Sequence, residues 1–317
     1  MPESEVEAFV PADLAGMRLD QALARMFPDY SRSRLKSWLL DGSITVDGGS
    51  PRPKDPVAGG EHVLLRPHVE ADQPAPAEPI ALDVAFEDEA VIVINKPAGL
   101  VVHPGAGNQR GTLMNGLMHR YPELSGLPRA GIVHRLDKDT TGLLMVGRTL
   151  TAHTALVRQL AERRVARHYD AVCGGVLTGG GVIDAPIRRH PVDRLRMAVQ
   201  EDGKPAVTRY TVRKRFAAHT WIRASLETGR THQIRVHFAW RRHPLVGDRT
   251  YGGRLALPPG ASQAVIDALR GFRRQALCAT RLAFEHPVSG EAVDIEIPPA
   301  DDFTALVDTL AAAPTSG

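Results

Sequence analysis

Apolar positions near the start of the chain repeat with the spacing of a helix. The first group lies three or four residues apart and is closed by Pro28: Leu19, Leu23, Met26 and Phe27. A second group would face inward on the next helix: Leu35, Trp38 and Leu39. Three basic residues occupy the outward positions of that helix: Arg32, Arg34 and Lys36. Ile44 and Val46 then alternate as in a short strand, so the pattern predicts a helix pair followed by small strands.

The rest of the chain alternates between strand-like and helix-like stretches. Residues 91–94 form a continuous apolar run, and 100–102 form a second one after a Lys-Pro-Ala-Gly turn. Residues 151–163 have the spacing of a helix, whereas 221–226 and 231–237 alternate between polar and apolar side chains. We therefore expect an α+β protein whose second part contains a substantial mixed sheet.

A proline-rich stretch separates these two regions. Its sequence PHVEADQPAPAEP offers few side chains that a core could bury, which is typical of a linker. We predict a small α/β domain at 13–66, a linker at 67–82 and a larger domain at 83–310.

Charge is unevenly distributed along the 317 residues, although the formal net charge is only +3. Residues 158–249 contain nineteen Lys or Arg against eight acids, whereas 67–89 contain seven acids and neither Lys nor Arg. A compositional bias of the genome would explain why Arg is preferred to Lys, but it leaves the segregation unexplained. The segregation favours a polyanionic partner such as nucleic acid.

Several classes of protein do not fit this chain. The two cysteines lack the spacing of a zinc site or a disulfide scaffold. No stretch approaches the roughly 18 to 20 apolar residues of a membrane span, and the first residues are acidic rather than basic. We expect a cytoplasmic protein without a membrane partner.

Cofactor motifs also fail. The Gly-rich residues 105–112 lack the Gly-Lys of a phosphate loop and the glycine pattern of a dinucleotide site. Four candidate metal ligands have unsuitable spacing: His134, Asp137, His232 and His237. We expect neither a nucleotide cofactor nor a metal.

Residues 131–146 contain eight polar or glycine positions, interrupted only by Leu136, between two apolar runs. This arrangement predicts a loop held at both ends by strands, with Asp137 in its middle. Loops of that kind carry functional residues, but an ordinary turn capped by an aspartate has the same pattern. Composition alone leaves both interpretations open.

The loop sequence HRLDKDTTGLLM resembles the signature of the RluA-type pseudouridine synthases. Three further segments resemble that family in the same order: VINKPAGLVVHPG at 93–105, RHYDAVCGG at 167–175 and ETGRTHQIRVH at 227–237. Residues 13–66, with SRSRLKSWLLDGSITVDG, resemble the RNA-binding domain named after ribosomal protein S4. The combination is similar to the RluD-like branch, which modifies large-subunit (23S) ribosomal RNA.

The resemblance implies an RNA pseudouridine synthase with Asp137 as its catalytic carboxylate. Such a carboxylate would attack the sugar carbon or remove a ribose proton, and both routes remain open. A cation should stabilise its ionised form, and Arg235 is our candidate. In a strand at 231–237, Arg235 would share a polar face with Gln233 and His237, away from His232. The family motif implies the same pairing.

The resemblance also implies roles for Tyr169 and Arg135. Tyr169 would stack on the uracil, although a buried core tyrosine would fit the same pattern. Arg135 would fill the gap left by the extruded nucleotide, or else contact a phosphate. Strand alternation places Arg230 on the apolar face just after Gly229, so we expect it to contact RNA near the strand entrance, outside the Asp137 pair. The S4-like domain would bind RNA through Arg32, Arg34 and Lys36.

Other functions fit less well. A non-catalytic RNA-binding protein has no need of the three candidate catalytic residues, and a hydrolase would need a second carboxylate with a comparable setting. A pseudouridine synthase that acts on another structured RNA, such as tRNA, is the main alternative.

Overall fold

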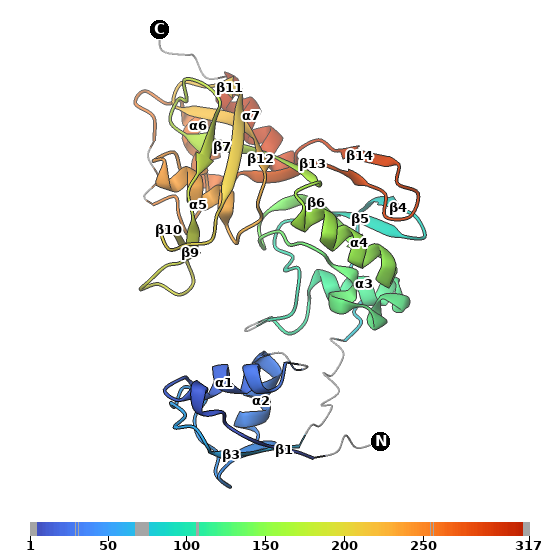
Figure 1. Cartoon of the computed structure of the whole chain (residues 1–317). Helices are drawn as coiled ribbons and strands as arrows, with labels where there is room; N and C mark the ends of the chain where they lie inside the picture. Colours follow the sequence, from blue (N-terminus) through green and yellow to red (C-terminus); the bar gives the residue numbers. More distant parts are fainter. Residues whose placement is uncertain are drawn as a thin grey trace. The chain divides into compact units, whose positions relative to one another are not determined.

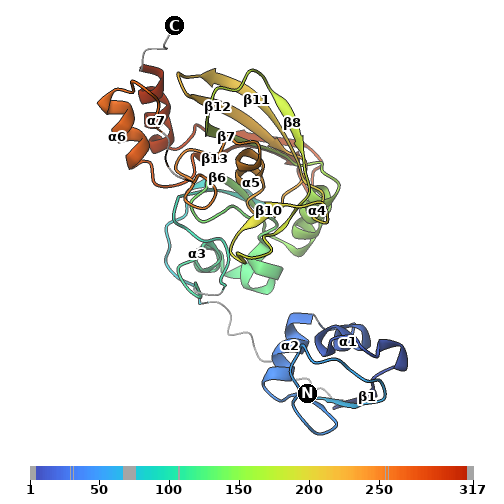
Figure 2. The same cartoon turned by 90° about the vertical axis from the view of Figure 1, so that its left-hand side faces the viewer.

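The computed structural model describes residues 5–28, 30, 32–66, 76–105, 108–253, 255 and 257–312, with only the backbone of 32–34. The chain divides into two compact units, Met1–Pro74 and Ala75–Gly317. Figures 1 and 2 draw both units, which are described separately below.

The smaller unit packs two helices on a three-stranded antiparallel sheet with the order β1-β3-β2. Its elements are β1 (Val6–Phe9), the short 3-10 helix η1 (Ala12–Leu14), α1 (Leu19–Met26), α2 (Arg32–Leu40), β2 (Ile44–Val46) and β3 (His62–Leu65). The apolar side chains predicted to face inward on the two helices are buried: Leu19, Leu23, Leu35, Trp38 and Leu39. The predicted helix pair with small strands is therefore confirmed.

The turn after β2 needs backbone that few residues adopt. Asp47 has a φ of 49° and Gly48 a φ of 73°, and the N–H and C=O groups of Val46 and Gly49 are hydrogen-bonded to each other at 2.9 Å. Positive φ at both central residues is typical of a tight hairpin turn with an Asp-Gly sequence.

The described part of the larger unit contains a nine-stranded mixed sheet with the order β4-β5-β6-β13-β7-β12-β11-β8, and β14 pairs with β13. Its strands are antiparallel except where β6 meets β13. They are β4 (Val84–Glu87), β5 (Val91–Lys96), β6 (Thr141–Gly147), β7 (Ala166–Gly174), β8 (Gly181–Asp184), β11 (Val207–Arg215), β12 (His219–Leu226), β13 (Leu277–Glu285) and β14 (Ala292–Glu296). A separate hairpin pairs β9 (Ile187–Arg189) with β10 (Met197–Val199).

Helices cover this sheet, and Figure 1 shows α6 and α7 side by side at one end of the larger unit. The helices are α3 (Leu113–Arg120), α4 (Leu150–Ala161), α5 (Gln233–Trp240), α6 (Gln263–Gly271) and α7 (Asp301–Ala312), with the 3-10 turns η2 (Pro122–Gly126) and η3 (Pro128–Gly131). The predicted α+β class is confirmed. Within the described ranges, no helix has the length and apolar character needed to cross a membrane.

Three predicted strands were wrong. The segment 231–237 enters helix α5, which begins after His232 in the left-handed region at φ 58°. The polar side chains predicted to share one face, Gln233, Arg235 and His237, are buried along with the apolar ones, so the alternation did not separate a solvent face from a core face. Residues 100–102 form only a single bridge, between Val101 and Thr112. The run before Asp137 is likewise the turn η3 and one bridge, from Ile132 to Val146.

Part of the predicted linker packs against α3. The N–H of Glu78 donates to Asn115 O at 3.0 Å, and the Asn115 side chain donates to Pro76 O at 2.8 Å. A side chain at Gly116 would come within 3.0 Å of Ile80. Residues 76–82 thus belong to the larger unit, and the segment 67–75 lies outside the described residues.

Candidate active site

The loop that carries Asp137 ends at the first residues of β6, where this strand pairs with β13. Thr141 and Gly142 pair in parallel with Cys278 and Ala279. Gly142 has a φ of 107°, and a Cβ at this position would lie 2.1 Å from Ala279 O. Glycine is therefore required at position 142, because any other side chain would collide with β13. The close pairing fixes the end of the loop against the centre of the sheet.

Lys96 holds the same loop from inside. Its fully buried side chain donates from Nζ to Pro97 O at 2.7 Å, Leu100 O at 3.0 Å and Lys138 O at 2.9 Å. Burial lowers the pKa of Lys96 to about 8, against the opposing charges of Asp139 and Asp137. The sequence motifs did not single out this residue, although a lysine that ends a continuous apolar strand was a signal for it.

Asp137 and Arg235 form an ion pair. Arg235 Nη1 donates to Asp137 Oδ2 at 2.9 Å, and their side chains are 7% and 15% exposed. Arg235 projects from α5 rather than from a strand. Arg235 is therefore paired with Asp137 as predicted. The strand alternation that supported this prediction was wrong, because the segment is a helix.

Asp248 orients the arginine. Arg235 donates from Nε to Asp248 Oδ2 at 2.7 Å and from Nη2 to Oδ1 at 3.0 Å. The backbone N–H groups of Thr250 and Tyr251 donate to the same carboxylate. Burial acts to raise the pKa of Asp248, but these hydrogen bonds lower it below its ordinary value. The two carboxylates raise the pKa of Arg235 despite burial, so the guanidinium stays charged.

His232 lies beside Asp137, although the predicted strand placed it on the face opposite to Arg235. Its Nε2 is 3.8 Å from Asp137 Oδ1, and its Nδ1 is hydrogen-bonded to Tyr251 Oη at 2.8 Å. The N–H of Met197 donates to the same hydroxyl at 2.9 Å. Burial lowers the pKa of His232, although Asp137 opposes the shift. Sequence alternation missed this residue because the left-handed backbone at His232 turns it toward the loop.

Tyr169 lies on β7 between β12 and β13. It is 5% exposed and belongs to a large hydrophobic cluster of the sheet. Burial raises the pKa of its hydroxyl; Arg167 opposes this shift, and the nearby charge of Asp137 adds to it. The residue is thus both a core tyrosine and a neighbour of the candidate carboxylate.

The candidate RNA contacts lie around this centre or in the smaller unit. Arg135 is exposed on the loop two residues before Asp137. Arg230 is half-buried and donates from Nε to Pro205 O at 3.1 Å, outside the Asp137 pair. Lys36 is exposed on α2, whereas the side chains of Arg32 and Arg34 lie outside the described residues.

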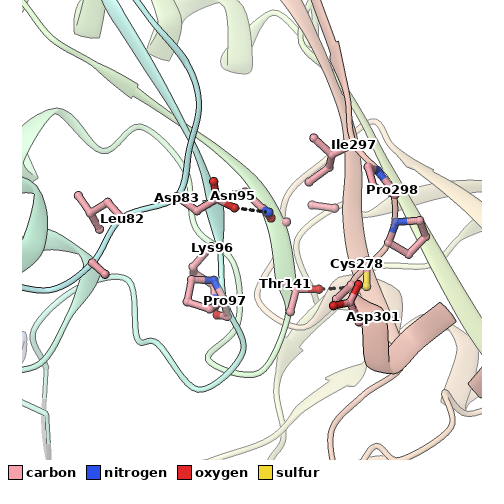
Figure 3. A pocket seen from close by; sticks show the side chains of 15 residues that line it. Leu82, Asp83, Asn95, Lys96, Pro97, Thr141, Cys278, Ile297, Pro298 and Asp301 are labelled. Atoms are coloured by element: carbon pink, nitrogen blue, oxygen red, sulfur yellow. Dashed lines mark hydrogen bonds between the residues drawn. The ribbon is translucent and has the colours of Figure 1, made fainter. Parts of the chain in front are cut away.

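A cavity of about 620 Å³ lies beside Lys96 and the first residues of β6 (Figure 3). Its wall includes Lys96, Thr141 and Cys278, and Thr141 Oγ1 donates to Cys278 Sγ at 3.0 Å. None of the candidate catalytic residues lines it. Over the part of the chain that can be described, no group of three or more His, Cys, Asp or Glu could hold a metal ion.

Comparison with known proteins matches both units. The RNA pseudouridylate synthase family matches residues 90–240, and the S4 domain matches residues 17–63. The chain is 53% identical to ribosomal large subunit pseudouridine synthase D of Vibrio parahaemolyticus, over 93% of this chain and 91% of the relative. It is 54% identical to the protein of that name from Xanthomonas campestris pv. campestris, over 96% and 92%. The structure of human RNA pseudouridylate synthase domain containing 4 shares the fold, with a TM-score of 0.57 and 24% identity over 72% of this chain and 93% of the human one.

Proposed function

The chain belongs to the RNA pseudouridylate synthase family, and we propose that it converts specific uridines of large-subunit (23S) ribosomal RNA to pseudouridine. The observation that carries the proposal is the Asp137 carboxylate, paired with Arg235 at 2.9 Å inside the matched region. The names of the near full-length relatives support the large subunit as the target. Another structured RNA, such as tRNA, is the alternative substrate.

Asp137 is the proposed catalytic carboxylate. The reaction breaks the bond between the ribose and uracil N1, turns the uracil, and forms a carbon–carbon bond to C5, whose hydrogen is then lost. Asp137 would attack the sugar carbon or remove a ribose proton, and each route needs it ionised. The charge of Arg235 favours that ionised form, and Asp248 keeps the guanidinium oriented toward it.

Tyr169 and Arg135 are the proposed residues that handle the base. Tyr169 would stack on the extruded uracil and stand near C5 for the final proton removal. Arg135 would occupy the gap in the RNA stack, since it is exposed on the same loop as Asp137.

The two units would divide the work of recognition. We assign RNA binding to the S4-like domain at 13–66 and catalysis to the larger domain, predicted at 83–310 and extended by residues 76–82, which pack against α3. The rest of the predicted linker at 67–82 would connect the two domains. Arg32, Arg34 and Lys36 would contact phosphates in the first domain, and Arg230 would do so in the second. An RNA substrate in ribosomal subunits supports a cytoplasmic location for the enzyme.

Mapping pseudouridines in cellular RNA tests the proposal. RNA is compared from cells that carry the gene, lack it, or express the Asp137→Asn variant in its place. We expect specific pseudouridines in large-subunit RNA only with the wild-type gene. Gene-dependent sites confined to tRNA would reassign the substrate, and an unchanged map would refute the proposed activity.

A further inference from the structure

Arg167 is a buried cation without a partner among the described residues. Its residue surface is 9% exposed, and its Nε is buried without a hydrogen bond. Its side chain forms no ion pair or hydrogen bond with any residue that the structure describes. Arginine is rarely buried unless it is paired, because removing the charge from water is costly. The guanidinium therefore has a binding capacity that the described chain leaves unused.

The position of Arg167 connects it with the candidate active site. It is two residues before Tyr169 on β7, so both side chains lie on the same face of the sheet. Its charge opposes the pKa rise of Tyr169 and, after burial, helps lower that of His134, which starts the Asp137 loop. The guanidinium thus lies within electrostatic reach of both the loop and the tyrosine.

The end of the guanidinium reaches an exposed glycine. A Cβ at Gly229 would lie 2.8 Å from Arg167 Nη1, and Gly229 itself is exposed. The absence of a side chain at Gly229 leaves the guanidinium room at the surface. A ligand with two negatively charged oxygens could accept hydrogen bonds there.

We propose that Arg167 binds an RNA phosphate next to the uridine that enters the site beside Tyr169 and Asp137. This inference rests on the proposed function, because that function supplies RNA as the ligand. Phosphates are the charged groups of RNA, and full negative charge offsets a buried cation better than a neutral uracil carbonyl does. An extruded nucleotide also brings its flanking phosphates to the mouth of its pocket.

Neutral phosphate analogues provide the test. The probe is an RNA fragment that contains a mapped target uridine, with a methylphosphonate at one of the two phosphates before or after it. Each probe and its reference carry the same stabilising 2′-O-methyl group. Binding is measured with the full-length Asp137→Asn protein, so that the RNA stays unchanged, with and without Arg167→Met.

We expect one methylphosphonate to weaken binding about tenfold when Arg167 is present and less than about twofold when it is Met. Arg167→Lys should restore part of the effect of the methylphosphonate on binding. Lysine keeps the positive charge but cannot donate the two parallel hydrogen bonds of a guanidinium. Arg163→Met is the matched control: Arg163 is 54% exposed and 3.7 Å from Glu227, and its removal should leave the tenfold effect intact. Equal weakening with and without Arg167 at every phosphate would overturn the inference.

Thermal unfolding without RNA separates binding from a structural role. Removing an unpaired buried charge should leave the Tm of Arg167→Met unchanged or higher. A lower Tm combined with unchanged RNA affinity would overturn the proposal. Pseudouridine formation by the wild-type protein on the unmodified RNA tests the proposed function separately, so the two failures are distinguishable.

Discussion

Arg235 joins Asp137 to Asp248. Its Nη1 donates to the loop carboxylate at 2.9 Å, while its Nε and Nη2 donate to the second carboxylate at 2.7 and 3.0 Å. The Asp248 side chain is fully buried, whereas Asp137 keeps 15% of its side-chain surface exposed. The Asp248 carboxylate therefore sets the direction of the guanidinium, and the partly exposed Asp137 carboxylate remains accessible to a substrate.

Asp137→Asn should abolish turnover while RNA binding survives, because the amide keeps the volume of the side chain and removes its charge. Single-turnover formation of pseudouridine and RNA affinity measure the two effects. Asp139→Asn on the same loop is the control and should stay active. Even a tenth of the wild-type rate in Asp137→Asn would correspond to a barrier increase of only about 1.4 kcal/mol, which would remove Asp137 from the chemistry.

Arg235→Met should inactivate the enzyme and also destabilise it by about 3–5 kcal/mol, because Asp248 is left as an unpaired buried carboxylate. Adding Asp248→Asn should recover part of the stability but none of the activity. Urea unfolding and single-turnover rates separate the two effects. Arg230→Met is the control, with weaker RNA binding and an unchanged fold. An active, fully stable Arg235→Met protein would contradict the role of the pair.

Lys96→Met should destabilise the protein at pH 7 by about 2 kcal/mol, because three carbonyl groups around the buried side chain lose their donor. The pKa of Lys96 is lowered from 10.5 to about 8 in the folded chain. Between these values the unfolded chain binds more protons, so the free energy of unfolding of the wild type should rise with pH relative to the variant, by roughly 3 kcal/mol in all. Chemical unfolding from pH 7 to 10.5 measures the difference. A flat or falling difference would mean that the three carbonyl groups keep the lysine protonated.

Deleting residues 1–66 should weaken RNA binding and leave some activity on a short stem-loop, since each unit has its own hydrophobic core. The salt dependence of binding should flatten by about 0.7 to 0.9 in log–log slope for each phosphate that the truncated protein no longer binds. A full-length variant with Arg32, Arg34 and Lys36 changed to Gln is the control for folding, and its slope should change in the same direction. An unchanged slope in both proteins would show that these residues do not touch RNA.

The pairing of Arg235 with Asp137 was predicted correctly from the motif and for the wrong reason from the alternation. Gln233 and His237 are buried. Both are hydrogen-bonded to Thr208, and His237 is also hydrogen-bonded to Ala185 O. Polar side chains whose hydrogen bonds are satisfied in this way can be buried in the core. A period of two in so short a segment therefore did not distinguish a strand from a helix.

Local pattern determined the two helices of the small unit, the sheet strands 91–94 and 221–226, and the helix at 151–163, because periodicity records which positions avoid water. Motif resemblance identified the candidate carboxylate and its arginine. The electrostatic partners were decided by tertiary structure. Arg235 and Asp137 are 98 positions apart, and Lys96 contacts the loop across 42. The stabilisation of a charge depends on its distance in space from an opposite charge and on burial. Neither is set until the sheet and α5 pack together.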